Sequence, residues 1–114
     1  METTRQLKIA KLLQKDLGEI FQREIADITG SFMLVTVTKV HVTKDLSLAK
    51  IYLSIFGVPD KQKAFELITS SAKVIRGKLG HKVRHQLRVV PELIFFLDDS
   101  LDYIDHIDEL LQND

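Results

Sequence analysis

Residues 35–56, VTVTKVHVTKDLSLAKIYLSIF, decide the fold, because apolar side chains recur at every second position along most of the stretch. β-Branched residues in such an alternation are typical of strands that are buried on one face. The alternation slips by one residue after Val37, which predicts a β-bulge at residues 38–39. A turn at residues 43–46 separates the two runs, so we predict an antiparallel hairpin.

Before the hairpin, residues 3–29 have the three- and four-residue spacing of an amphipathic helix. Thr3 and Gln6 fit a capping box, in which each side chain bonds the other's main-chain N–H. Gly30 fits the left-handed residue that ends a helix. The helix should bury an apolar stripe against the sheet, formed by Ile9, Leu13, Leu17, Ile20, Phe21, Ile25 and Ile28.

After the hairpin, residues 60–84 return to helical spacing, with Asp60 as the expected N-cap. Residues 69–71 are Thr-Ser-Ser, and their hydroxyl groups compete for main-chain hydrogen bonds. We therefore predict a kink that divides this region into two helices. The side chains expected to face the sheet are Leu67, Ile75 and Leu79.

A third strand is predicted at residues 89–97, where Pro91 implies an edge position or a bulge. Because a helical crossover of about 25 residues precedes it, this strand should pair parallel to a neighbour. Residues 100–112 have the spacing of a short acidic helix whose apolar stripe should dock on the domain. The prediction is one α+β domain over residues 1–114, ordered α-β-β-α-kink-α-β with an acidic C-terminal helix.

Composition excludes several classes of protein. Apolar residues make up 45% of the chain and charged residues 28%, which is typical of a globular domain. The absence of cysteine excludes disulfides, thiolate catalysis and cysteine-bound zinc. No apolar run approaches the roughly 20 residues of a membrane span, and the N-terminus lacks the pattern of a signal peptide. We expect a cytoplasmic protein with no membrane association.

The formal net charge of zero hides an uneven distribution. All 16 lysines and arginines precede residue 92, together with eight of the acids. Residues 92–114 hold the other eight acids and no base. The first 91 residues are therefore strongly basic, which favours a polyanion as partner.

Sites for catalysis or metal binding are not predicted. His81 and His85 have the spacing of a zinc-binding helix, but Lys82 and Arg84 lie between them and would repel a divalent ion. The C-terminal carboxylates lack the pattern of a calcium loop, and no glycine-rich phosphate loop is present. We expect no enzyme activity, no cofactor and no metal.

Residues 73–88 carry six bases and no acid. A solvated helix face, the alternative explanation, usually mixes charges, because oppositely charged pairs four residues apart stabilise it. The composition therefore favours a surface that binds phosphates, and the scarcity of aromatic residues favours recognition of backbone and shape. The predicted RNA-binding residues are Lys73, Arg76, Lys78, Lys82, Arg84 and Arg88, with Lys8, Lys11 and Lys15 of the first helix as additional candidates.

Four segments in order resemble one family over nearly the full length: residues 5–28, residues 40–54, residues 75–80 and residues 90–100. The second is similar to a V-x-V-S-x-D-L-x-x-A-x-V-Y-V-S segment, and the fourth to an x-P-E-L-x-F-x-x-D-x-S strand. Both are features of ribosome-binding factor A, a bacterial factor for maturation of the small ribosomal subunit. The resemblance implies a KH-like fold of the second type.

In that family a helix–kink–helix with an Ala-x-Gly sequence replaces the usual Gly-x-x-Gly loop. The matching residues here are Ser71, Ala72 and Lys73, so the motif is not kept literally. The resemblance implies a non-catalytic monomer that binds the free 30S subunit through 16S rRNA. It also implies a role in late maturation, including processing of the 16S rRNA 5′ end, and in growth in the cold. The alternative is an α+β protein-interaction or ligand-sensing module without RNA binding.

Overall fold

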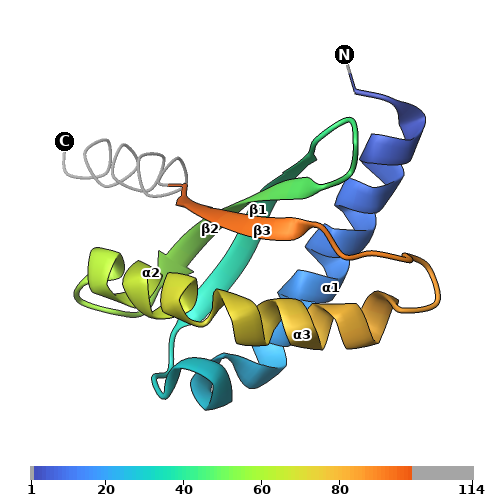
Figure 1. Cartoon of the computed structure of the whole chain (residues 1–114). Coiled ribbons are helices and arrows are strands. Elements are labelled where there is room, and N and C mark those ends of the chain that lie inside the picture. The colour runs from blue at the N-terminus through green and yellow to red at the C-terminus, as the bar shows by residue number, and fades with distance from the viewer. Residues whose placement is uncertain (1, 99–114) are drawn as a thin grey trace, which may run out of the picture.

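The computed structural model describes residues 2–98 and contains three helices and three strands in that range (Figure 1). Their order confirms the predicted α-β-β-α-kink-α-β arrangement, which is that of a KH-like fold of the second type. The predicted acidic helix at residues 100–112, with its docking on the domain, lies outside the described residues. The elements are α1 (Thr4–Thr29), β1 (Leu34–Val42), β2 (Leu48–Phe56), α2 (Lys61–Ser70), α3 (Ala72–Val83) and β3 (Glu92–Leu97).

The three strands form one sheet in the order β1-β2-β3. β1 and β2 make the predicted antiparallel hairpin, with the bulge between Val37 and Lys39, and β3 pairs parallel to β2. The third strand begins at Glu92, three residues later than predicted. Pro91 has no N–H to donate to a neighbouring strand, and the first ladder bond runs from the Glu92 N–H to the Ser47 carbonyl at 2.9 Å.

Helix α1 begins and ends as predicted. The Thr3 hydroxyl accepts from the Gln6 N–H at 3.2 Å, and the Gln6 side chain accepts from the Thr3 N–H at 2.8 Å. Gly30 ends the helix with a φ of 76°, which an L side chain rarely adopts. This pair of caps fixes the length of α1 and hence which residues meet the sheet.

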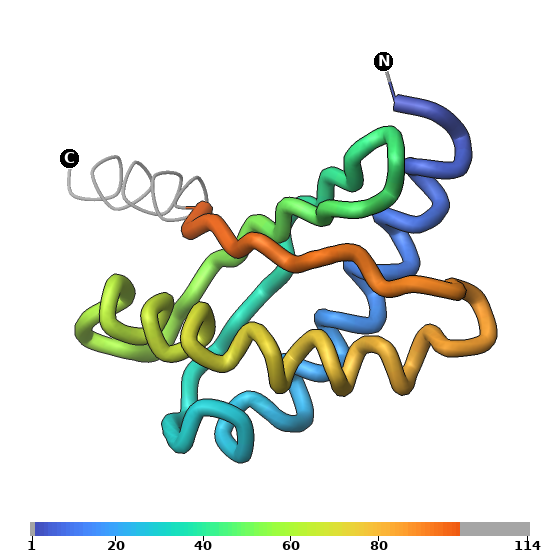
Figure 2. The backbone as a smooth tube through the Cα atoms, viewed as in Figure 1, coloured from blue at the N-terminus to red at the C-terminus, as the bar shows by residue number. Residues whose placement is uncertain are grey.

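One face of the sheet carries the core. α1 and α3 cover this face and contact each other, and Figures 1 and 2 show them crossing. Alternate residues of β2, such as Ile51 and Leu53, are fully buried there, and Phe21 of α1 meets Phe95 of β3 edge to face. No helix within residues 2–98 is both long and apolar enough to cross a bilayer.

The predicted kink is a break at Ser71, between α2 and α3. Three hydroxyls bond back to carbonyls of the preceding turn: Thr69 to Glu66, and Ser70 and Ser71 both to Leu67, each at 2.9 Å. Ser71 leaves the helical conformation with φ −98° and ψ 8°. The competition for main-chain acceptors that predicted the kink is therefore present in the structure.

Most of the predicted core residues are buried. Ile20, Phe21, Ile75 and Leu79 are at most 1% exposed. Leu67 is only partly buried and packs at the margin of the core, while its helical neighbours Ala64 and Ile68 are buried. The prediction that Leu67 is buried is therefore wrong in degree.

Candidate nucleic-acid interface

The predicted RNA-binding residues lie on α3 and in the segment that joins it to β3. Because Ile75, Leu79 and Val83 turn one side of α3 into the core, the polar residues of the helix lie on its remaining surface. The exposed members of the set are Lys73, Arg76, Lys82, Arg84 and Arg88, whereas Lys78 is half-buried.

Arg76 bonds the main chain of the segment before β3. Its Nε donates to the Pro91 carbonyl at 3.1 Å, and its Nη2 donates to the Val90 carbonyl at 2.6 Å. Both carbonyls precede a strand that begins only at Glu92, so this side chain holds the entrance to β3 against α3. Arg76 therefore has a structural role in addition to any contact with phosphate.

Two bases of α3 are paired with acids of α1. Lys78 Nζ lies 2.9 Å from Glu24 Oε1, and Lys82 Nζ lies 2.8 Å from Glu19 Oε2. The Lys82 ammonium lowers the pKa of Glu19, and Glu19 in turn raises the pKa of Lys82. The six bases of residues 73–88 are thus partly neutralised, by acids about 60 residues earlier in the chain.

The two histidines flank an arginine. Arg84 Nη1 lies 3.2 Å from His81 Nδ1, and Arg84 Nε donates to His85 Nε2 at 3.3 Å. A guanidinium between two imidazoles keeps a cation where a metal ion would have to sit. Among residues 2–98, the structure brings together no group of three or more histidine, aspartate or glutamate side chains suited to a metal ion.

A hollow of about 360 Å³ lies beside α3 and is lined by Lys73, Arg76, Gly77 and Val90. A Cβ placed on Gly77 would meet no atom within 4 Å, so the helix surface is open at this point. Two cations beside a backbone without a side chain leave room for phosphate oxygens to approach. Arg88 lies apart, in a second hollow of about 320 Å³ beside the hairpin turn and the first turns of α1.

The additional candidates on α1 are all exposed. The Lys15 ammonium helps to lower the pKa of Glu19, after the larger effect of Lys82. Arg23 also acts on Glu19 and Lys82, and the sequence had not marked it as part of this surface. Lys15 and Arg23 of α1 and Lys82 of α3 therefore all act on Glu19.

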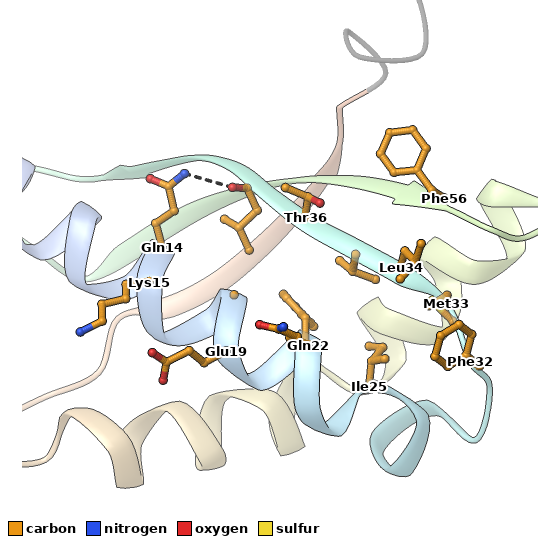
Figure 3. Close-up of a pocket in the computed structure, with 14 residues that line it drawn as sticks. Gln14, Lys15, Glu19, Gln22, Ile25, Phe32, Met33, Leu34, Thr36 and Phe56 are labelled. Atoms are coloured by element: carbon orange, nitrogen blue, oxygen red, sulfur yellow. Dashed lines mark hydrogen bonds between the residues drawn. The ribbon is translucent and has the colours of Figure 1, made fainter. Parts of the chain in front are cut away.

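Two apolar surfaces were not predicted from the sequence. The sheet face opposite the core carries Tyr52 and Phe96, stacked with ring centroids 5.2 Å apart, and the Lys39 ammonium lies 5.9 Å from the Tyr52 ring. The other surface is a groove between α1 and β1, beside Phe32 and Leu34 (Figure 3). The run of apolar residues at 32–35 could have indicated it, since these side chains cannot all face one core.

Similarity to known proteins extends over nearly the whole chain. A sequence model of the family described as ribosome-binding factor A matches residues 5–111. Ribosome-binding factor A of Flavobacterium johnsoniae is 49% identical over 111 residues, which is 97% of this chain and 85% of that protein. The protein of the same name from Flavobacterium psychrophilum is 47% identical over the same shares of both chains.

Solved structures show the same fold. The crystal structure of ribosome-binding factor A from Thermus thermophilus superposes with a TM-score of 0.65 at 22% identity, over 81% of this chain and 94% of that one. The solution structure of a Thermotoga maritima protein described as a putative ribosome binding factor A gives 0.60 at 25% identity, over 84% and 89%. With a family match that covers most of its length and relatives close to half identical, this chain belongs to the ribosome-binding factor A family.

Proposed function

We propose that this protein binds the free 30S ribosomal subunit through 16S rRNA and assists late maturation of the subunit, including processing of the 16S rRNA 5′ end. The family match over residues 5–111 carries the proposal. A coordinate set for the Thermus thermophilus ribosome-binding factor A, which shares this fold with a TM-score of 0.64, was fitted into a cryo-electron microscopy map of a 30S complex of that protein. In this proposal the protein is a cytoplasmic monomer that acts by binding alone, without catalysis or a cofactor, and it supports growth in the cold.

The exposed bases of α3 and the following segment supply the phosphate contacts in this proposal. Lys73 and Arg76 border one hollow, and Arg84 and Arg88 follow along the chain. Lys78 and Lys82 are held by Glu24 and Glu19, so a phosphate must compete with a carboxylate for each of them. Lys8, Lys11 and Lys15 extend the surface along α1. Of the predicted kink residues, Ser71 ends α2, and Ala72 and Lys73 begin α3.

The alternative, a protein-interaction module without RNA binding, is supported by the apolar groove between α1 and β1. The two functions differ in their response to salt. Binding through phosphates weakens steeply as salt increases, because counterions are released from the nucleic acid. Association through an apolar groove changes little with salt.

Co-sedimentation with free 30S subunits and with full ribosomes tests the proposal. We expect binding to the free subunit and not to the full ribosome. Lys73→Glu with Arg84→Glu should weaken binding by at least about tenfold, because both positions then repel phosphate. Lys39→Glu with Lys63→Glu is the matched control, since it changes the net charge equally at exposed positions outside α3. Equal losses in the two double variants would reduce the effect to net charge and contradict the α3 surface.

A further inference from the structure

A groove of about 630 Å³ lies between α1 and the edge of the sheet (Figure 3). Phe21 and Ile25 of α1 line it from one side, and Leu34 and Phe56 line it from the other. Phe32, at the entrance to β1, is 74% exposed, and Leu34 is 56% exposed. A cluster of large, exposed apolar side chains in a concave region is typical of a surface that binds a partner.

The groove runs along an unpaired strand edge. β1 is the outer strand, and among residues 2–98 no strand pairs with its outer side. α1 protects part of this edge: Gln14 donates to the Val37 carbonyl at 3.0 Å, and Gln6 donates to the Val42 carbonyl at 2.8 Å. Main-chain groups of alternate residues point the same way, so the N–H and carbonyl of Val35 also point outward. Beside Val35 the edge faces the groove.

Gly18 keeps the helical side of the groove open. It stands in the middle of α1, where glycine weakens a helix, and it lines the groove. A Cβ at this position would meet no atom within 4 Å. Packing within the described chain therefore does not require glycine, and its effect is to leave room beside the strand edge.

The charge of the groove disfavours nucleic acid. Its lining includes one base, Lys15, and one acid, Glu19, which is itself paired with Lys82. A phosphate backbone would gain no net attraction here. An extended polypeptide would complement the groove. Its main-chain donors and acceptors can bond to Val35 at the edge of β1, and its alternating side chains can pack against the apolar walls.

We infer that residues 34–37 of β1 receive an extended segment of a protein of the small subunit as a further strand of the sheet. One side chain of that segment fits against α1 beside Gly18, and the next lies against Leu34 and Phe56. This inference rests on the proposed function and names a second partner in the same complex. The rRNA meets the bases of α3, while a subunit protein meets the edge of β1.

Photo-crosslinking on the 30S subunit tests the inference. A benzoylphenylalanine replaces Phe32 in one variant and Val74 in a second; Val74 is 52% exposed on α3 and serves as the matched position. After irradiation with free 30S subunits, the label at Phe32 should join a ribosomal protein and the label at Val74 should join rRNA. A label at Phe32 that joins only rRNA, a second copy of this chain, or nothing overturns the inference.

The two proposals fail in different ways. If the unmodified protein does not co-sediment with 30S subunits, the proposed function is overturned and this inference with it. If the Phe32-labelled protein co-sediments but gives no crosslink to a protein, only the inference is overturned.

Filling the groove gives a second test that does not depend on the label's chemistry. Gly18→Leu places a side chain in the open space and removes a helix-weakening glycine, so thermal stability should rise while the crosslink from Phe32 falls several-fold. Ala26→Leu, at an exposed position of α1 outside the groove lining, should leave the crosslink unchanged. An undiminished crosslink in Gly18→Leu overturns strand addition at this edge.

Discussion

Arg76 of α3 has a structural role beside its proposed contact with RNA. Its guanidinium bonds two consecutive carbonyls, those of Val90 and Pro91, and so joins α3 to the start of β3. Lys73 lies one turn earlier on the same helix and is exposed. Substitutions at these two positions should therefore separate stability from RNA binding.

Arg76→Ala should lower the free energy of unfolding by about 1–2 kcal/mol, because two charge-assisted hydrogen bonds on a partly exposed side chain are lost. Lys73→Ala should change it by less than about 0.5 kcal/mol, as expected for an exposed position. Urea denaturation at neutral pH measures both values. Equal stability of the two variants would contradict the structural role of Arg76.

The Glu19–Lys82 pair predicts a specific pH dependence. The lowered pKa of Glu19 means that its contribution to stability is complete above the usual value of 4.5 and is lost as pH falls through the lowered pKa. The raised pKa of Lys82 means that its contribution is complete below the usual 10.5 and is lost as pH rises through the raised pKa. Thermal denaturation of the wild type and Glu19→Gln should therefore differ at neutral pH and converge in acid. A constant difference down to strongly acidic pH would contradict the pairing.

At the scale of the element, α3 is held by its apolar side. Leu79 is fully buried, whereas Val74 on the same helix is 52% exposed. Leu79→Ala should cost about 2–5 kcal/mol of stability, since it leaves a cavity beneath the basic surface of α3. Val74→Ala should cost less than about 1 kcal/mol. Chemical denaturation distinguishes the two, and similar losses would show that α3 does not pack as described.

Local patterns were sufficient to predict most of the elements. The slip after Val37 located the bulge, and the run of hydroxyl residues at 69–71 located the break between α2 and α3. Both depend on interactions within a few residues of sequence. The start of β3 was predicted too early, because hydrophobicity at residues 89–90 does not reveal that Arg76 occupies the Val90 carbonyl.

The candidate site was harder to predict, because the charges that pair there lie far apart in the sequence. The bases at 73–88 were identified from composition, but pairing of Lys78 with Glu24 and of Lys82 with Glu19 joins segments far apart in sequence. The groove was missed for the same reason, since it arises only where α1 crosses the edge of β1. Neither the phosphate contacts nor the strand addition is tested by the fold, and both stay predictions.

At the scale of the whole molecule, the pairing of Lys78 and Lys82 with acids should limit how steeply RNA binding weakens with salt. If Lys73, Arg76, Arg84 and Arg88 each contact one phosphate, log K should fall with log salt at a slope of about −3 to −4. Titration of the 30S subunit at several salt concentrations measures this slope. A slope near zero would contradict binding through phosphates, whereas a steeper slope would show that further bases, those of α1 or the paired Lys78 and Lys82, also contact rRNA.

The parallel pairing of β2 with β3 has a consequence for synthesis of the chain. β3 joins β2 through bonds from the Glu92 N–H to Ser47 and from the Asp98 N–H to Leu53. A ribosome makes the chain from its N-terminus, so α1 and the hairpin emerge before β3, the second partner of β2. Until β3 emerges, β2 has one unpaired edge, and until residues 90–91 emerge, Arg76 lacks the two carbonyls to which it donates. α3 therefore gains its bonds to the segment before β3 only after the hairpin and both preceding helices have been made.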